Sequence, residues 1–333
     1  MKKIVLIAIA VALLLSSFYF YNQYKENMKT YHKSDVYFTI KSGDTLSKIT
    51  DELFNKKIIK SKTFFKLYTR YKGLDTKLKS GSYLIKAGID IDELLKKLSS
   101  GKSDYKIITI PEGFNLHQIA QRLENNGFIK KDELLNAKIS DYDKANLFDN
   151  DKKVFYELEG YLFPDTYYIP YTAQSTEVIS ILFNQFAKNY SQEFRNRAKE
   201  LGLKNSQIIT IASLIEKEAA NDDERKRIAG VIYNRLRLNM PLQIDATVIY
   251  GITKGEKNIP RLYNKDYQYE SVYNTYKFTG LPPGPIASPG IKSIEAALYP
   301  EEHDYLYYVY TGEGHVFSKT YQEHLKNVNK YIK

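Results

Sequence analysis

Glu216 and Glu218 are the residues of this chain best suited, by type and spacing, to proton transfer. They adjoin a helical pattern with one apolar face, made by Ile208, Ile211, Ala212, Ile215 and Ala219. At about 100° per residue, the two glutamates flank that face on opposite sides. A carboxyl against aliphatic walls is poorly hydrated, so its pKa rises and it can donate a proton to a leaving oxygen. The spacing favours neither glutamate, and taken alone it is more typical of two boundary glutamates with no chemistry.

A second helix and a strand are expected to follow and to carry further polar groups. Asn221, Asp222 and Asp223 supply side-chain acceptors for the first free amides of the helix, which ends before Pro241. Residues 242–250 then fit a strand, whose alternation points three polar residues to one side, Gln243, Asp245 and Thr247. Such a face would either line a ligand subsite or form the hydrated side of an edge strand.

The composition excludes several classes of site and function. The chain has 333 residues, 43% of them hydrophobic, which is enough for two modest domains or one large domain. It contains no cysteine, which excludes disulfides, cysteine–zinc sites and a thiol nucleophile. The net charge of +10 would suit an anionic partner, but abundant Lys, Ile, Asn and Tyr are also typical of an AT-rich genome. No basic run alternates with aromatic residues, so we expect no nucleic-acid partner.

An apolar segment near the N-terminus predicts a membrane anchor. Residues 4–20 form an uncharged stretch of 17 residues, which as a helix spans roughly 26 Å, near the lower limit for crossing a bilayer. A cleaved signal peptide is the alternative, but the small-residue pattern lies inside the apolar segment instead of after it. We therefore expect a cytoplasmic tip and single-pass transmembrane anchor over residues 1–21 and a polar tether over 22–36. The remainder would lie on the periplasmic or extracytoplasmic side of the cytoplasmic (inner) membrane.

Residues 38–67 are repeated at residues 108–137. The two stretches align without gaps at an offset of 70, with nine identities in thirty positions. Each begins with a β-rich run, turns at a glycine and enters an apolar helical pattern, with Asp44 and Asn115 as candidate N-caps.

The first copy resembles a LysM module, a small βααβ fold that binds N-acetylated glycans, through the opening YFTIKSGDTLSKIT. The resemblance implies a glycan-binding module over residues 37–104, although the same unit would also serve as a spacer. The chain lacks tryptophan, so any sugar stacking would fall to tyrosines such as Tyr37, Tyr68, Tyr71 and Tyr83. We expect the second copy to open a larger domain over residues 105–333 and to pack beneath it.

A series of motifs in fixed order, from about residue 37 to the C-terminus, resembles the YceG-like family of membrane-anchored endolytic peptidoglycan transglycosylases. The motifs are IASLIEKEA, VIYNRL, LQIDATVIYG, YNTY, TGLPPGPI and SPG. The resemblance identifies the second glutamate of the E-K-E triplet, Glu218, as the catalytic acid. It also implies that substrate is bound by Glu159, Asn234, Gln243, Asp245, Thr247, Asn274 and Tyr276. Residues 280–286 would form a wall of the cleft, and the family needs no metal or cofactor.

Three residues depart from the family pattern, Ala219, Ala246 and Leu325. The last replaces the asparagine of an E-H-N motif, which casts doubt on a polar role around His324. Because the histidines also lack the close spacing of metal ligands, we leave His315 and His324 out of the expected site.

The expected fold class is α+β, with an N-terminal transmembrane helix, a small LysM-like βααβ module and a larger mixed α+β catalytic domain. The expected partners are peptidoglycan glycan strands and the cytoplasmic membrane. The family resemblance also allows peptidoglycan synthases (penicillin-binding proteins) as partners. A lytic transglycosylase needs a single acid/base residue, because the muramyl 6-hydroxyl traps the sugar cation and leaves a 1,6-anhydro end. Two alternatives stay open: a muramidase that activates water through Asp245 as a second carboxylate, and an inert glycan-binding scaffold.

Overall fold

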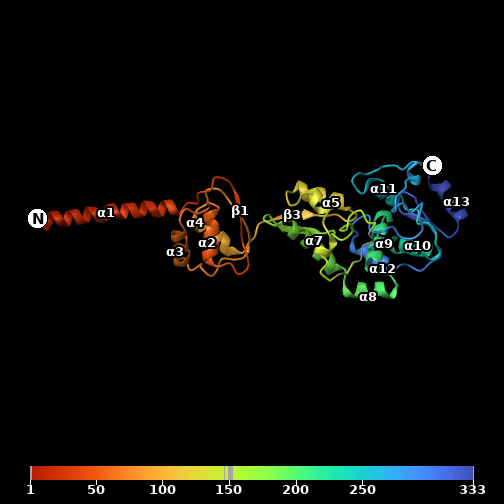
Figure 1. Ribbon diagram of the computed structural model, residues 1–333, viewed down its shortest axis with the longest axis horizontal. Coiled ribbons are helices and arrows are strands. Elements are labelled where there is room, and N and C mark those ends of the chain that lie inside the picture. The colour runs from red at the N-terminus through yellow and green to blue at the C-terminus, as the bar shows by residue number, and fades with distance from the viewer. Residues whose placement is uncertain (1, 146, 149–152, 333) are drawn as a thin grey trace. The chain divides into compact units, whose positions relative to one another are not determined.

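The computed structural model describes residues 2–145, 147–148 and 153–332, and the chain divides into two compact units (Figure 1). Unit 1 comprises Met1–Lys106 together with Tyr168–Ala173, and unit 2 comprises Ile107–Tyr167 together with Gln174–Lys333. The expected α+β class is confirmed, because short two-stranded sheets alternate with helices along the chain. The division lies close to the boundary expected between residues 104 and 105, but a short later segment also belongs to unit 1.

Unit 1 is built around an antiparallel strand pair that encloses two helices in sequence. Val36 pairs with Ile85 and Ile40 pairs with Gly81, while the helices between the strands pack on a core that includes Phe38, Leu53 and Phe65. The elements are α1 (Lys2–Asn27), β1 (Val36–Ile40), α2 (Leu46–Asn55), α3 (Lys62–Tyr71), β2 (Gly81–Ile85) and α4 (Ile91–Ser100). The β–α–α–β order is therefore present, and glycan binding by this module stays a prediction.

The tyrosines expected to stack on sugars differ widely in exposure. Tyr83 is fully buried and its Oη donates to Lys79 O at 2.8 Å, so it is a core residue and the expectation of sugar contact is wrong for it. Tyr68 is also buried, whereas Tyr71 is 83% exposed. The ring of Tyr37 stacks on that of Tyr171 with centroids 4.3 Å apart. Tyr71 is the most exposed of the four.

The segment expected to be a free tether is packed onto unit 1. Residues 22–27 continue α1, and the Tyr24 ring meets the Phe64 ring edge-on at 5.8 Å. Beyond the helix, Thr30 N donates to Ile89 O at 3.2 Å. Within the part of the chain that the structure describes, no helix combines the length and the apolarity that a membrane span requires, and the anchor expected over residues 1–21 stays a prediction.

Unit 2 holds the second copy of the repeat and the longer helical region. β3 (Tyr105–Thr109) pairs with β4 (Thr166–Pro170), and each strand has residues in both units. The other elements of unit 2 are α5 (Leu116–Asn125), α6 (Lys131–Leu135), a 3₁₀ turn (Ile139–Asp141), α7 (Ser175–Asn189), α8 (Gln192–Glu200), α9 (Asn205–Glu218), α10 (Arg225–Arg237), α11 (Asp245–Thr253), a 3₁₀ turn (Asp266–Gln268), α12 (Ile291–Leu298), β5 (Tyr307–Tyr310), β6 (His315–Ser318) and α13 (Tyr321–Tyr331). Figure 1 labels most of these elements in chain order.

The repeat is visible as equivalent helices with different caps. α2 and α5 are both ten residues long and begin 70 positions apart. Asn115 caps α5 as expected, through a capping box with Gln118, whereas α2 is capped by Thr45 instead of Asp44. Asp44 is engaged elsewhere, since its carboxylate accepts from Lys41 N at 2.8 Å.

The strand expected over residues 242–250 is wrong. Gln243 has a φ of 54°, a left-handed conformation that ends extended structure, and α11 begins two residues later. Thr247 Oγ1 donates to Ile244 O at 2.6 Å in the first turn of that helix. The β-branched residues of this segment favour a strand by propensity, but burial of Thr247 and Val248 in the core of unit 2 overrides that preference. The three polar residues consequently do not share one strand face.

Replacing the α5 cap should cost more stability than replacing its repeat equivalent. We expect Asn115→Ala to lower the free energy of unfolding by about 1–2 kcal/mol, because Asn115 also donates to Gly255 O at 3.0 Å. Thr45→Ala removes only a cap bond of 3.3 Å and should cost about 0.5–1 kcal/mol. Denaturant unfolding of the full chain, followed by circular dichroism, measures both; equal losses would contradict the prediction.

Candidate active site

α9 is a core helix that is buried through its middle and partly exposed in its first and last turns. Every residue from Ile208 to Ile215 is buried, where the sequence predicted a single apolar face. α10, α11 and α12 all pack against it. Its buried hydroxyls are satisfied within the helix, since Thr210 Oγ1 donates to Ser206 O and Ser213 Oγ donates to Thr210 O. The two glutamates that spacing could not separate lie in the last turn.

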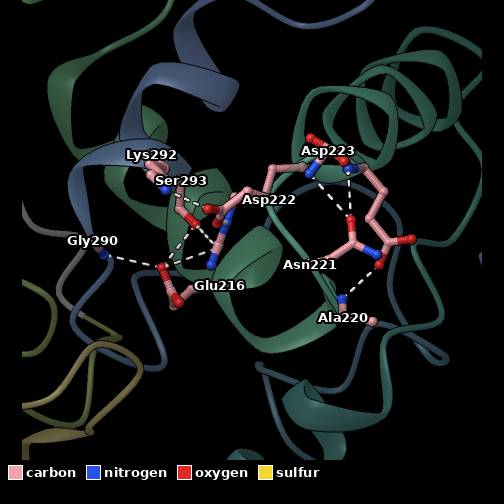
Figure 2. A network of polar contacts seen from close by, with 10 residues as sticks. Glu216, Ala220, Asn221, Asp222, Asp223, Gly290, Lys292 and Ser293 are labelled. Carbon is pink, nitrogen blue, oxygen red and sulfur yellow. Dashed lines mark hydrogen bonds and ion pairs between the residues drawn. The ribbon is translucent and has the colours of Figure 1, made fainter. Parts of the chain in front are cut away.

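Glu216 is fully engaged in holding α12 against α9. Figure 2 shows its carboxylate directed at Gly290 and Ser293 at the start of α12, where Oε2 accepts from Gly290 N at 3.0 Å and from Ser293 Oγ at 2.8 Å. The same oxygen is 3.3 Å from Arg225 Nη1, and the Glu216 side chain is only 6% exposed. Glu216 Oε2 is thus committed to Arg225 and to the start of α12.

The turn after α9 is closed by Asn221 and Glu224. Asn221 Oδ1 accepts from Asp223 N at 3.1 Å and from Glu224 N at 3.3 Å, as Figure 2 shows for Asp223. Glu224 Oε1 accepts from Ala220 N at 2.6 Å. α10 then begins at Arg225 without a side-chain cap, so the acidic and amide residues expected to cap it order the preceding turn instead.

Glu218 faces a cavity of about 400 Å³. Its Oε2 accepts a hydrogen bond from Tyr308 Oη at 2.8 Å, and no ion pair to it occurs in the described part of the chain. Burial raises the pKa of Glu218, the Tyr308 hydrogen bond opposes that rise, and the negative charge of Asp245 adds to it. The net result is a carboxyl that holds its proton to higher pH than an ordinary glutamate. The same cavity is lined by Gln243, Asp245, Tyr276, Tyr307 and His315.

Asp245 is the second carboxylate of this cavity. It is the first residue of α11, and its Oδ1 accepts from Tyr276 Oη at 2.6 Å. Tyr267 Oη lies 3.4 Å from Oδ2, and the rings of the two tyrosines meet at 4.6 Å. The tyrosines therefore fix an exposed carboxylate in one orientation beside Glu218.

Arg235 positions two walls of the cavity through backbone carbonyls. It is 8% exposed, its Nε donates to Leu306 O at 2.7 Å and its Nη1 donates to Leu242 O at 2.7 Å. The first bond holds the chain entering β5, and the second holds the segment that carries Gln243. Arg235 thereby fixes the spacing between these segments.

The β5–β6 hairpin brings Tyr308 and His315 to the cavity. Tyr308 pairs with Phe317 and Tyr310 pairs with His315 in an antiparallel register. His315 Nδ1 is 2.9 Å from Glu224 Oε1, and His315 N donates to Glu224 Oε2 at 3.0 Å. Glu224 thus ties the hairpin to the turn that follows Glu218.

Four residues expected to bind substrate lie away from this cavity. Glu159, Thr247 and Asn274 are buried, with exposures of 2%, 0% and 1%. Glu159 accepts from Leu116 N and Tyr250 Oη, Thr247 bonds Thr275 Oγ1, and Asn274 Nδ2 donates to Tyr267 O and Tyr269 O. Asn234 Nδ2 donates to His303 O at 2.7 Å. Glu218, Gln243, Asp245 and Tyr276, by contrast, line the cavity.

A larger cavity of about 540 Å³ lies along the first half of α9. Gly280, Leu281, Pro282 and Pro283 line it together with Ser206, Gln207 and Thr210. The segment expected to wall the cleft around Glu218 therefore borders a different cavity. No carboxylate lines this second cavity, so its lining lacks the proton donor that the first one has.

Sequence reasoning missed Tyr308, Arg235 and Glu224, and it set His315 aside. The signal for the hairpin was present, because alternating aromatic and apolar residues flank a Gly-Glu-Gly turn. Nothing in the local sequence indicates that the Tyr308 hydroxyl reaches a helix 90 residues earlier. Among the described residues, no group of three or more histidines and carboxylates could hold a metal ion. The arrangement is suited to general acid chemistry.

Comparison with known proteins gives consistent matches along most of the chain. Residues 38–330 match the model of the YceG-like family. The endolytic murein transglycosylase of Bacillus subtilis is 38% identical over 316 residues, covering 90% of this chain and 86% of that protein. That of Streptococcus pneumoniae serotype 2 is 34% identical, covering 88% of this chain and 58% of the relative. A crystal structure of a YceG-like protein from Listeria monocytogenes is 34% identical, with a TM-score of 0.60 over 89% of this chain and 99% of that one.

Removing the Tyr308 hydroxyl should raise the pKa of Glu218. The hydrogen bond stabilises the ionised carboxylate, so Tyr308→Phe should shift the pKa further upward. Carboxyl carbon resonances in a pH titration of glutamate-labelled protein measure the shift. Tyr310→Phe is the matched control, because Tyr310 Oη donates to Gly312 O instead. A Tyr308→Phe titration that overlays the wild type would contradict the assignment.

Glu159→Gln should remove a pH dependence of stability. Burial raises the pKa of Glu159 to about 7 from its ordinary 4.5, so between these values the folded state keeps a proton that the unfolded state has lost. The wild-type free energy of unfolding should therefore fall as pH rises from 4.5 to 7, by about 3 kcal/mol at about 1.4 kcal/mol per pKa unit.

Unfolding curves at several pH values test this expectation. The free energy of unfolding of the wild type, relative to that of Glu159→Gln, should decrease as pH rises from 4.5 to 7. Above pH 7 the difference between the two proteins should become constant. Glu193→Gln, which changes an exposed glutamate of α8, should run parallel to the wild type. Parallel curves for Glu159→Gln as well would show that Glu159 titrates normally.

Proposed function

The chain belongs to the YceG-like family, and on that premise we propose that it is an endolytic murein transglycosylase. The proposed substrate is the glycan strand of nascent peptidoglycan, cut within the strand at the β-1,4 bond between N-acetylmuramic acid and N-acetylglucosamine. One observation carries the proposal: a carboxyl with a raised pKa, paired with no cation among the described residues, faces a cavity that a second carboxylate also lines. The names of the B. subtilis and S. pneumoniae relatives support the same activity.

Glu218 would act first as an acid. Its proton passes to the glycosidic oxygen, the bond to the muramyl C1 breaks, and positive charge develops on the sugar ring. Asp245, held by Tyr276, is placed to stabilise that charge electrostatically. The muramyl 6-hydroxyl then bonds to C1, its proton returns to ionised Glu218, and a 1,6-anhydro end is left. The acid is regenerated without water.

A muramidase is the second candidate, and Asp245 is the reason to keep it. Retaining and inverting glycosidases use two carboxylates, and Glu218 and Asp245 line one cavity. Asp245 already accepts from two tyrosine hydroxyls, which favours a role in charge stabilisation over activation of water. The two candidates differ in the product, which decides between them.

Several finer expectations stay predictions. They are action on the outer side of the cytoplasmic membrane with one anchoring helix, association with peptidoglycan synthases, and glycan binding by residues 37–104. Cutting during strand synthesis would terminate elongation. A scaffold that binds glycan without cutting it is the remaining alternative, and an assay of cleavage separates it from the enzyme.

Glu218→Gln should abolish cleavage while leaving the fold and glycan binding intact. Loss of a general acid lowers rates by about 10²–10⁴-fold, and a glutamine occupies the same volume. Digestion of uncrosslinked peptidoglycan, followed by mass spectrometry of the products, measures both rate and chemistry. The wild type should yield 1,6-anhydromuramic ends, and reducing muramic ends alone would establish the muramidase.

Glu216→Gln is the matched control in the same helical turn. It removes the charge that pairs with Arg225, so we expect a loss of stability with cleavage retained in the folded fraction. Cleavage by Glu218→Gln at the wild-type rate would exclude Glu218 as the acid. Loss of cleavage in Glu216→Gln alone would move the role to Glu216.

A further inference from the structure

His315 presents an unused ring nitrogen in the cavity of Glu218. Its side chain is 8% exposed, and it lines the cavity between the ring of Tyr308, at 5.2 Å, and that of Tyr310, at 5.4 Å. Nδ1 is engaged with Glu224 Oε1 at 2.9 Å. Nε2 has no hydrogen-bond partner among the described residues. It is also not a fully buried atom, so it is accessible from the cavity.

Glu224 determines whether Nε2 of His315 donates or accepts a hydrogen bond. Burial opposes ionisation of Glu224, but hydrogen bonds from the His315 ring and from the backbone of Ala220 and His315 hold its pKa below the usual range. An ionised carboxylate at Nδ1 requires a proton on that nitrogen. In the neutral ring Nε2 therefore carries the lone pair and accepts a hydrogen bond.

Several other polar groups of the cavity are already committed. Tyr276 Oη donates to Asp245, Tyr308 Oη donates to Glu218 and Tyr310 Oη donates to Gly312 O. The Nε and Nη1 of Arg235 bind backbone carbonyls. A protonated Glu218 is a weak acceptor before the reaction begins. His315 Nε2 is thus an acceptor in the cavity of Glu218 that has no bond to give up.

We propose that, while Glu218 still holds its proton, His315 Nε2 accepts a hydrogen bond from the muramyl 6-hydroxyl and keeps that hydroxyl beside C1, with Glu224 as a positioning residue that orients the ring. Once Glu218 is ionised, the hydroxyl proton passes to Glu218 as the bond to C1 forms. The inference rests on the proposed transglycosylase reaction and deepens it. A hydroxyl held in place competes with water for the sugar cation, so His315 would determine the ratio of anhydro to reducing ends.

Two substitutions separate this role from a structural one. In His315→Asn the side-chain amide replaces Nδ1, keeps the bond to Glu224 and has nothing at the position of Nε2. In His315→Gln the amide reaches the position of Nε2 but loses the bond to Glu224. Thermal unfolding reports the structural contribution, and mass spectrometry of peptidoglycan digests reports the product ratio, each against the wild type.

We expect His315→Asn to unfold near the wild-type temperature and to raise the proportion of reducing muramic ends roughly fivefold, the effect of losing one hydrogen bond. His315→Gln should be less stable but keep more of the anhydro product. Glu224→Gln, which weakens the orientation of the ring, should fall between the wild type and His315→Asn in product ratio.

The outcomes distinguish this inference from the proposed function. A wild-type product ratio in His315→Asn overturns the role of Nε2 and leaves the transglycosylase standing. Loss of stability in His315→Asn with an unchanged product ratio identifies His315 as a structural clamp only. Wild-type digests without any anhydro ends would remove the proposed function and this inference together.

Discussion

The candidate site depends on a difference between two glutamates in one helical turn. The Glu216 carboxylate has a paired cation and several hydrogen-bond donors, whereas the Glu218 carboxyl has no paired cation among the described residues. Glu216 meets Arg225, Ser293 and a backbone amide, and its charge holds α12 onto α9. Among the residues that the structure describes, the only hydrogen bond to the Glu218 carboxyl comes from the hydroxyl of Tyr308. Because α9 is buried from Ile208 to Ile215, this difference is set by which neighbour each side chain reaches as the helix leaves the core. A cation beside Glu218 would stabilise the anion and remove its capacity to donate a proton.

The walls around that carboxyl are assembled from segments distant in sequence, and buried polar residues join them. Arg235 binds the carbonyls of Leu242 and Leu306, which places the segment before α11 opposite the hairpin. Glu224 binds Ala220 and His315, which places the turn after α9 against the same hairpin. Removing either residue would leave buried backbone groups unpaired, so these bonds contribute to stability and also set the geometry of the cavity.

Helical spacing located the apolar residues of α9 and the position of its two glutamates, and the internal repeat located α2 and α5. Family resemblance, not spacing, selected Glu218. Spacing failed at residues 242–250, since a buried helix of β-branched residues has the composition of a strand. It also could not identify which polar residues face solvent: Thr247 and Asn274 are buried, whereas Gln243 and Asp245 are exposed. Such contacts depend on pairings across tens of residues, as between Tyr308 and Glu218.

Two helix ends meet at the cavity with opposite polarity. Glu218 is the last residue of α9, where the aligned peptide dipoles leave partial negative charge, and Asp245 is the first residue of α11, where they leave partial positive charge. The backbone therefore disfavours an anion at one carboxyl and favours it at the other. The cavity therefore has an electrical direction set by the backbone, which runs from the C-terminus of α9 to the N-terminus of α11.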